Sequence, residues 1–158
     1  MNNFNTADLC DDHKLAIAQP IFKSYGANTH CHGRIRTVEA IEDNSYVKKL
    51  LQEDGTGYIM VVDGKSSEKC ALVGDNLAAL GAKNNWAGII VNGCIRDSLE
   101  ISKINISIKA LNLVPNKSQK KDIGRYKIDL NFAGIVFREN DFLYSDPDGI
   151  VVSSSELL

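Results

Sequence analysis

The stretch that decides the fold runs from Gly74 to Glu100 and reads GDNLAALGAKNNWAGIIVNGCIRDSLE. Its first part, DNLAALGAKNN (75–85), places its leucines on one face of a predicted helix. Its second part, WAGIIVNG (86–93), is a nearly continuous apolar run, which is typical of a strand buried on both faces. Its third part, RDSLEIS (96–102), predicts a short helical turn. The stretch therefore predicts a helix, a buried strand and the start of a second helix.

Matching patterns flank this stretch on both sides. GYIMVVDG (57–64) and ISIKALNL (106–113) predict two more strands. Before them, RIRTVEAI (34–41) alternates like a strand, and SYVKKLLQ (45–52) indicates a short helix with Ser45 near its cap. Strands that alternate with helices along a chain favour a parallel sheet with right-handed crossovers.

The two ends of the chain have a different pattern of predicted elements. A first helix is expected from Thr6 to Ala18, with Thr6 as its N-cap and Pro20 as its stop. Beyond Pro115, a polar loop (116–124) precedes short strand patterns, the last two joined by the turn sequence DPDG: YKIDL, GIVF, FLYSD and GIVVS. This half is expected to be antiparallel.

Length and composition limit the class of protein. The chain has 158 residues, of which 44% are hydrophobic, so we predict one domain over 1–158. The fold class is α/β, layered, with a parallel central sheet and a smaller antiparallel sheet. The net charge of −2 argues against a nucleic-acid surface, and no apolar run is long enough to span a membrane. The first residues have neither a basic nor an apolar leader region, so a cytoplasmic protein with free thiols is expected.

The spacing within the opening stretch predicts a ligand site. In parallel α/β sheets, ligands bind beyond the carboxyl ends of the strands. Asp75 starts a helix that leads away from this edge, and the following strand returns to it at Arg96. The twenty residues between them are enough for that path, so both groups are expected at one corner. The N–H groups of Asn76 and Leu77 would point there as well, where they could bind an anion.

The residue types at this corner suit one kind of chemistry. Asp97 and Glu100 are three apart, neighbours on one helical face, and such carboxylates suit Mg²⁺ or Mn²⁺. Arg96 can grip a carboxylate or enolate oxygen with two donors. Together they could bind a 2-keto acid and stabilise its enolate. The plain alternative is that Asp75 is only a helix cap and that Arg96 and Asp97 form a surface ion pair.

Other patterns give weaker signals. HCH (30–32) suggests a metal, but in a strand His30 and His32 share one face while Cys31 points to the other, and no second Cys/His pair completes a zinc site. The lysines of the 116–124 loop are most simply solvated. Trp86 is expected in the core or in a subunit interface.

Five segments of the sequence resemble one known family. They are TADLCD (6–11), VVDG (61–64), ALVGDNLA (71–78), NNWAGIIVNGCIRD (84–97) and LYSDPDGIVVS (143–153). They follow in the order seen in the regulator of ribonuclease E activity A family. That family includes the class II 4-hydroxy-4-methyl-2-oxoglutarate aldolases, which also decarboxylate oxaloacetate. The resemblance covers nearly the whole chain.

The resemblance implies a fold, an assembly and a set of roles. The fold is a swivelling β/β/α domain, and the assembly is a ring-shaped homotrimer, doubled in some members to a hexamer, with the site near a subunit interface. Asp97 looks like the metal ligand, with Glu100 holding a metal-bound water. Arg96 looks like the group that orients the substrate and stabilises the pyruvate enolate. Asp75 looks like the acid/base residue, acting through a water; the stretch from Gly74 through the Asn76 and Leu77 amides looks like the carboxylate cradle.

The family also implies alternatives to a lyase. Some members bind ribonuclease E and inhibit it without known catalysis, and some of these lack the aspartate that follows the arginine; Asp97 and Glu100 are both present here. Longer aldolases extend an acid into the neighbour's site. Because this sequence ends at Leu158, oxaloacetate decarboxylation is the better supported reaction. A methyltransferase label in this family would need a glycine-rich dinucleotide-type fingerprint, which the sequence lacks.

Overall fold

The computed structural model describes residues 4–158; residues 1–3, the start of the predicted domain, lie outside the described part. Within the described residues, four helices and twelve strands are formed. The helices are α1 (Thr6–Asp12), α2 (Ser45–Leu51), α3 (Asp75–Lys83) and α4 (Ser98–Ile101). The strands are β1 (Ala16–Ile17), β2 (Lys23–Ser24), β3 (Cys31–Glu39), β4 (Tyr58–Asp63), β5 (Ala71–Val73), β6 (Gly88–Ile95), β7 (Ser107–Leu113), β8 (Arg125–Tyr126), β9 (Leu130–Phe132), β10 (Ile135–Phe137), β11 (Phe142–Asp146) and β12 (Gly149–Ser153).

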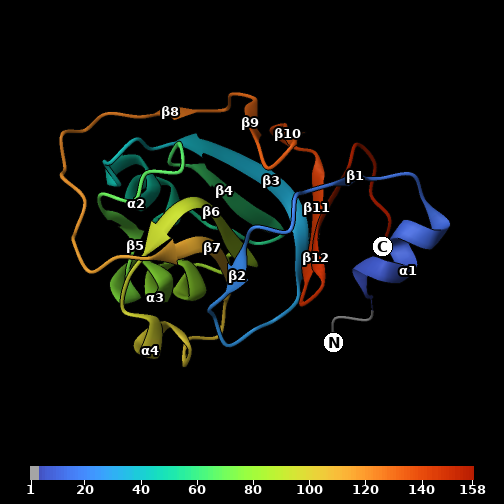
Figure 1. The fold of residues 1–158 in the computed structure, drawn as a ribbon, viewed down its shortest axis with the longest axis horizontal. Coiled ribbons are helices and arrows are strands. Elements are labelled where there is room, and N and C mark those ends of the chain that lie inside the picture. The colour runs from blue at the N-terminus through green and yellow to red at the C-terminus, as the bar shows by residue number, and fades with distance from the viewer. Residues whose placement is uncertain (1–3) are drawn as a thin grey trace.

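One large mixed sheet forms the centre of the molecule (Figure 1). Its main path runs β1-β12-β11-β3-β4-β6-β7-β2, and β5 pairs with β6. Neighbours from β3 through β4 and β6 to β7 are parallel, which confirms the predicted parallel core. The helices α2, α3 and α4 occur in the connections between these strands.

Alternate residues of the central strands enter different cores. In β4, Met60 and Val62 belong to a core that also contains apolar side chains of α2, α3 and α4. Ile59 and Val61 belong to a second core on the opposite face, which β9, β10, β11 and β12 help to close. Because both faces are covered, the strand is apolar at nearly every position, as its sequence predicted.

The antiparallel half is joined to the parallel half in the same sheet. β11 and β12 form the hairpin predicted around DPDG, and β11 pairs antiparallel with β3. A separate small sheet is formed by β9 and β10, also antiparallel. The predicted fold class, α/β with a parallel central part and a smaller antiparallel sheet, is therefore confirmed.

The first helix is shorter than predicted. α1 ends at Asp12 rather than Ala18, and its N-cap is Asn5, whose side chain accepts from the Asp8 N–H. The Thr6 hydroxyl, predicted as the cap, donates to Asp146 Oδ1 instead (2.7 Å). The predicted helix fails beyond Asp12 because Ala16 and Ile17 pair with β12 as a strand. A distant partner overrides the local pattern there.

Several short strands were misjudged or missed in the sequence. YKIDL (126–130) is not one strand: β8 ends at Tyr126, Lys127 has a positive φ of 55°, and β9 starts at Leu130. β1, β2 and β5 have only two or three residues each and were not predicted. Of these, β5 matters most, since it directly precedes the predicted site.

Two general expectations can be compared with the described residues. All four cysteines (Cys10, Cys31, Cys70 and Cys94) are free thiols, as predicted. None of the helices within residues 4–158 combines the length and the apolarity needed to cross a membrane.

Candidate active site

Two chain segments meet where β5 and β6 end side by side. The two strands are parallel, so their carboxyl ends lie at the same edge. Gly74 and Asp75 follow β5, while Arg96 and Asp97 follow β6, and the Arg96 N–H donates to the Val73 carbonyl (3.0 Å). We call these four residues the β5–β6 corner. The corner is where the spacing in the sequence predicted it, although the strand that brings Asp75 there was missed.

Asp97 is held in an unusual conformation at the corner. Its φ of 61° and ψ of 41° are left-handed, and it precedes α4 as its N-cap. One carboxylate oxygen, Oδ2, accepts from the Asp75 N–H (3.2 Å). A Cβ atom at Gly74 would lie 2.7 Å from that same oxygen, so only glycine leaves the carboxylate where it is. Oδ1 has no hydrogen-bond partner in the described chain, and the side chain is 36% exposed.

Arg96 lies beside this carboxylate with most of its donors unused. Its Nη1 donates to the Pro115 carbonyl (3.4 Å), and its Nε lies 3.9 Å from Asp97 Oδ2. The side chain is 39% exposed. A guanidinium has five N–H donors, so the remaining ones can reach an anion in solvent.

The start of α3 completes the corner. Asp75 Oδ1 accepts from the Asn76 N–H (2.8 Å), so one of the two predicted cradle amides is engaged by the neighbouring side chain in this structure. The Leu77 N–H lies in the same first turn, where N–H groups have no partner inside the helix. Gly74, the N-cap, contributes no side-chain bond to these groups.

Glu100 lies apart from the other predicted site residues. Its carboxylate pairs with Lys103 Nζ (3.3 Å), and its side chain is 60% exposed. It does not line the cleft into which the other predicted residues open. Those that do line it are Gly74, Asp75, Asn76, Leu77, Arg96 and Asp97.

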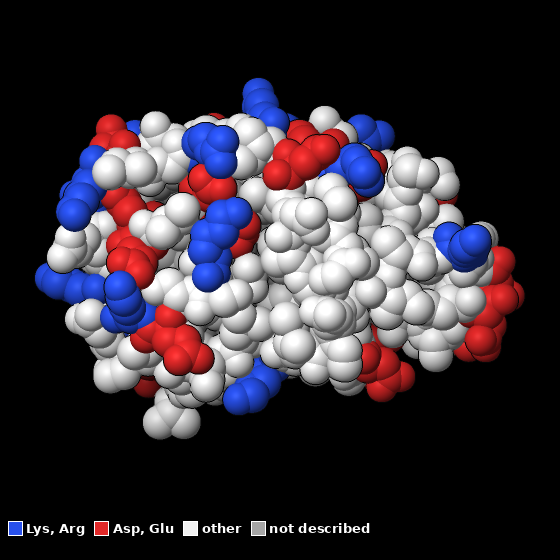
Figure 2. All heavy atoms as spheres, turned by 45° about the horizontal axis from the view of Figure 1, so that its top comes forward, with Lys and Arg blue, Asp and Glu red and all other residues white. Residues whose placement is uncertain are grey.

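The cleft has a volume of about 1180 Å³ and is rich in charged side chains. Besides Arg96, five lysines line it, and the acids lining it are fewer: Lys48, Lys69, Lys117, Lys120, Lys121, and Glu42, Asp43, Asp75, Asp97. The cleft is therefore cationic in a chain whose net charge is negative. Figure 2 shows charged side chains crowded over one end of the molecule, whereas a broad central face carries few. A cationic cleft suits an anionic ligand.

Asp43 fixes the far wall of the cleft, which the sequence did not reveal. Its Oδ2 accepts from the N–H groups of Lys121 (2.6 Å) and Ile123 (3.3 Å), and its Oδ1 accepts from Ser45 N–H (2.8 Å). Burial alone would raise the pKa of Asp43, but these hydrogen bonds, with one from the Ser45 side chain, outweigh burial and lower it. The 116–124 segment is thus tethered through its backbone as a wall of the cleft, while its three lysine side chains are exposed, as predicted.

The donor set at the corner fits a hard divalent cation. Within residues 4–158, no group of three or more His, Cys, Asp or Glu side chains is placed to hold a metal. Mg²⁺ does not need one, because it commonly takes one or two carboxylates and keeps several waters. Asp97 lines the cleft and its Oδ1 is unpartnered, while a side chain at Gly74 would clash with its Oδ2. His30 and His32, in contrast, both pack edge-on against Phe4, as aromatic neighbours.

Fold and corner together define an α/β domain with a charged cleft at the carboxyl edge of its sheet. A family model described as RraA-like, Aldolase/RraA, matches residues 6–152, and the chain belongs to this family. A relative from Alkalilimnicola ehrlichii is 50% identical, over 97% of this chain and 96% of its own length. It carries the provisional name 4-hydroxy-4-methyl-2-oxoglutarate aldolase.

Two solved structures are similar over almost their whole length. The RNA-processing inhibitor RraA from Thermus thermophilis has a TM-score of 0.96 and 34% identity, covering 99% of this chain and 96% of its own. A Geobacillus kaustophilus protein, described as an S-adenosylmethionine:2-dimethylmenaquinone methyltransferase, has a TM-score of 0.95 and 39% identity. It covers 98% of this chain and 97% of its own. Three proteins similar to this chain thus carry three different functional names.

Proposed function

We propose that this protein is a divalent-metal-dependent carbon–carbon lyase that cleaves pyruvyl acids at the β5–β6 corner. The observation that carries the proposal is the corner itself. An unpartnered carboxylate oxygen, a guanidinium with unused donors and a helix start open into one cationic cleft. The name of the Alkalilimnicola ehrlichii relative supports the reaction class. Candidate substrates are oxaloacetate and 4-hydroxy-4-methyl-2-oxoglutarate.

Asp97 is the proposed ligand for Mg²⁺ or Mn²⁺. Glu100 would contact a water of that ion, which requires its carboxylate to leave Lys103. The ion would act as a Lewis acid toward the keto and carboxylate oxygens of the substrate. Loss of the Asp97 carboxylate should therefore remove both binding and turnover.

Arg96 is proposed to orient the substrate and to stabilise the charge that develops. When the C3–C4 bond breaks, its electron pair stays on the pyruvyl fragment as an enolate. Oxaloacetate then releases carbon dioxide, and 4-hydroxy-4-methyl-2-oxoglutarate, after loss of its hydroxyl proton, releases a second pyruvate. Donors placed where negative charge develops lower the barrier most, and Arg96 has such donors free.

Asp75 is proposed as the acid/base residue. Its carboxylate lies in the cleft beside Asp97, and its Oδ1 is engaged only by the neighbouring Asn76 N–H. A water held by Asp75 would deliver the proton that converts the enolate to pyruvate. The N–H groups of Asn76 and Leu77 would bind the substrate carboxylate once the Asp75 carboxylate moves away from the Asn76 N–H.

Regulation of an endoribonuclease is the second candidate function. It is supported by the similarity to the Thermus thermophilis inhibitor of RNA processing. In this role the protein, as a ring-shaped homotrimer, would bind ribonuclease E through its surface and would not need the β5–β6 corner. The two functions use different parts of the molecule, so one chain could have both.

The first experiment measures pyruvate release from oxaloacetate with Mg²⁺ and with EDTA, after subtraction of the metal-driven background. We expect metal-dependent turnover in the wild type and a loss of about 10³-fold or more in Asp97→Ala. Arg96→Lys keeps the charge but not the paired donors, and should lose about 10²-fold. Lys83→Ala, which removes an exposed charge from the last turn of α3, is the matched control and should stay near the wild-type rate.

Wild-type protein without turnover above background would contradict the lyase proposal. The regulator would then be tested by binding of purified ribonuclease E, with Asp97→Ala expected to bind as the wild type does.

A further inference from the structure

β6 is irregular just before it delivers Arg96 and Asp97 to the site. Its register against β7 shifts by one residue, from the pair Val91–Ala110 to the pair Cys94–Asn112. β6 thus has two residues, Asn92 and Gly93, opposite a single residue of β7. Such a bulge bends a strand and increases its twist, and bulges often re-aim side chains near active sites. The conformation at Asn92 and Gly93 therefore helps to decide where Arg96 lies.

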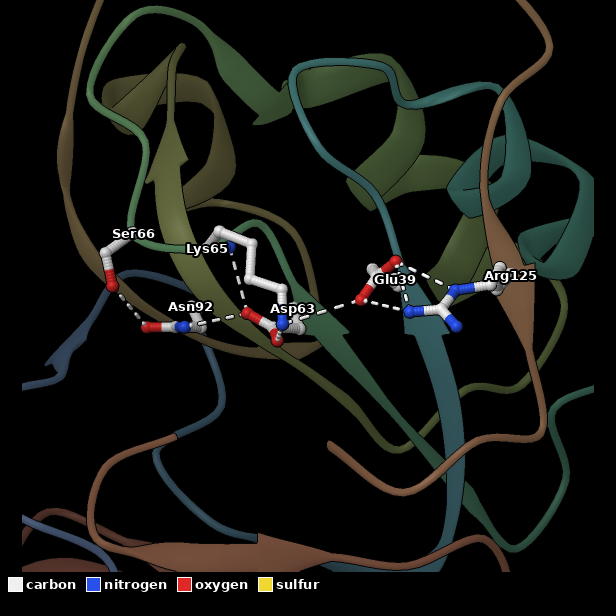
Figure 3. A network of polar contacts seen from close by, with 6 residues as sticks. All are labelled: Glu39, Asp63, Lys65, Ser66, Asn92 and Arg125. Atoms are coloured by element: carbon white, nitrogen blue, oxygen red, sulfur yellow. Dashed lines mark hydrogen bonds and ion pairs between the residues drawn. The ribbon is translucent and has the colours of Figure 1, made fainter. Parts of the chain in front are cut away.

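The end of β4 and the turn after it hold this bulge by main-chain and side-chain hydrogen bonds, and Figure 3 shows the side-chain contacts. The Asn92 carbonyl accepts from the N–H groups of Gly64 (3.0 Å) and Ser66 (3.1 Å). The Asn92 side chain donates from Nδ2 to Asp63 Oδ1 (2.9 Å) and accepts at Oδ1 from the Ser66 hydroxyl (3.1 Å). Asn92 and Asp63 are 3% and 1% exposed, so water cannot readily replace this bond.

Asp63 is itself fixed from several sides. Its Oδ1 also accepts from the Lys65 N–H (2.9 Å), and the Lys65 ammonium lies 3.0 Å from its Oδ2. Lys65 also approaches Glu39 (3.5 Å), which in turn accepts two hydrogen bonds from Arg125 of β8. The acceptor for Asn92 is therefore linked through Lys65 to Glu39 of β3, and through Glu39 to Arg125 of β8.

The β6 bulge also contacts β5, the strand that leads to Gly74 and Asp75. β5 has its own irregularity at Leu72, between the pairs Ala71–Cys94 and Val73–Ile95. A Cβ atom added at Gly93 would lie 3.4 Å from Leu72 Cδ1, and one added at Gly64 would lie 2.5 Å from it. The two bulges and the β4 turn thus pack against one another.

We propose that the Asn92–Asp63 hydrogen bond is a positioning contact that fixes the β6 bulge and so sets where Arg96 and Asp97 lie against the start of α3. Neither Asn92 nor Asp63 lines the cleft, so the effect is transmitted through the backbone of β6. The kinetic consequence rests on the lyase proposed above. The geometric consequence does not, because the Asp75 N–H donates to Asp97 Oδ2 whatever the chemistry.

Asn92→Ala is the variant that tests this. We expect kcat/KM for oxaloacetate to fall about tenfold or more, since small displacements of positioned groups are costly. We also expect faster hydrogen exchange at the Asp75 amide. Asn84→Ala is the matched control, because Asn84 also donates one side-chain hydrogen bond, to the Leu51 carbonyl (2.7 Å), at the far end of α3. The Asn84→Ala protein should be less stable, but its kcat/KM and its hydrogen exchange at the Asp75 amide should not change.

The exchanged pair Asp63→Asn with Asn92→Asp gives the decisive comparison. Asn92→Asp alone sets two carboxylates against each other and should be worse than Asn92→Ala. The double variant restores one donor and one acceptor and should recover most of the loss. The proposal is overturned if Asn92→Ala keeps wild-type kinetics and Asp75 exchange, or if the double variant recovers nothing over Asn92→Asp. If the wild type shows no turnover, the lyase fails, but Asp75 exchange still decides the positioning claim.

Discussion

At the residue scale, the corner depends on one glycine and one left-handed aspartate. Gly74 gives the Asp97 carboxylate room that no other residue would leave. Asp97 adopts φ 61°, a conformation that costs most residues other than glycine more than it costs Asp or Asn. Sequence spacing placed both residues at one edge, but it could not reveal this fit, because φ and the 2.7 Å approach arise only when β5 pairs with β6.

Gly74→Ala should move the Asp97 carboxylate without unfolding the protein, since the clashing atom is the end of a side chain. We expect kcat/KM for oxaloacetate to fall by about tenfold or more, with a weaker affinity for Mn²⁺. Gly149→Ala is the control, because a Cβ there meets nothing within 4 Å. Steady-state kinetics and thermal unfolding of both variants provide the test, and equal activity of the two would contradict the packing argument.

At the element scale, strands with a clear apolar pattern were predictable, whereas the two- and three-residue strands β1, β2 and β5 were not. β4 and β6 are buried on both faces, so their apolar runs identify them without knowledge of their partners. β1 and β5 are strands only because β12 and β6 pair with them. The bulge in β6 was likewise invisible, because register is a relation between two strands.

The same reasoning explains α1, which a distant carboxylate anchors. Asp146 accepts from the N–H and the hydroxyl of Thr6 (2.6 and 2.7 Å) and from the N–H groups of Asp148 and Gly149. Burial raises the pKa of Asp146, but these hydrogen bonds together lower it below its ordinary value of 3.8. The charged form is thus the one that holds α1 to the β11–β12 hairpin.

Asp146→Asn should destabilise the protein by about 1–3 kcal/mol and loosen α1 most. Because the folded-state pKa is lowered, the Asp146 contribution is complete well above pH 3.8 and is lost as the pH falls through the folded value. The variant should therefore differ most from the wild type at neutral pH and approach it in acid. Urea unfolding across this range measures the effect, with the exposed Asp148→Asn as control; a difference that grows in acid would refute it.

At the scale of the whole molecule, the parallel and antiparallel halves of the sheet contribute different parts of the structure. The parallel half brings β5 and β6 to one edge and so creates the corner, while the antiparallel half closes the second core. The sequence was sufficient for the fold class and for gathering most of the predicted site residues. It did not predict that the Glu100 carboxylate pairs with Lys103. It also did not predict the role of Asp43, which accepts a hydrogen bond from Lys121, 78 residues further along the chain.

The central claim is that the corner forms and protonates a pyruvate enolate with a divalent metal. The most direct measurement is the exchange of pyruvate methyl protons for deuterium in D₂O, followed by proton NMR with Mg²⁺ or Mn²⁺ present. We predict exchange well above background in the wild type, its loss with EDTA, and its loss in Asp97→Ala and Asp75→Asn. Exchange that is absent from the folded, metal-loaded wild type, or that persists undiminished in Asp97→Ala, would contradict the account.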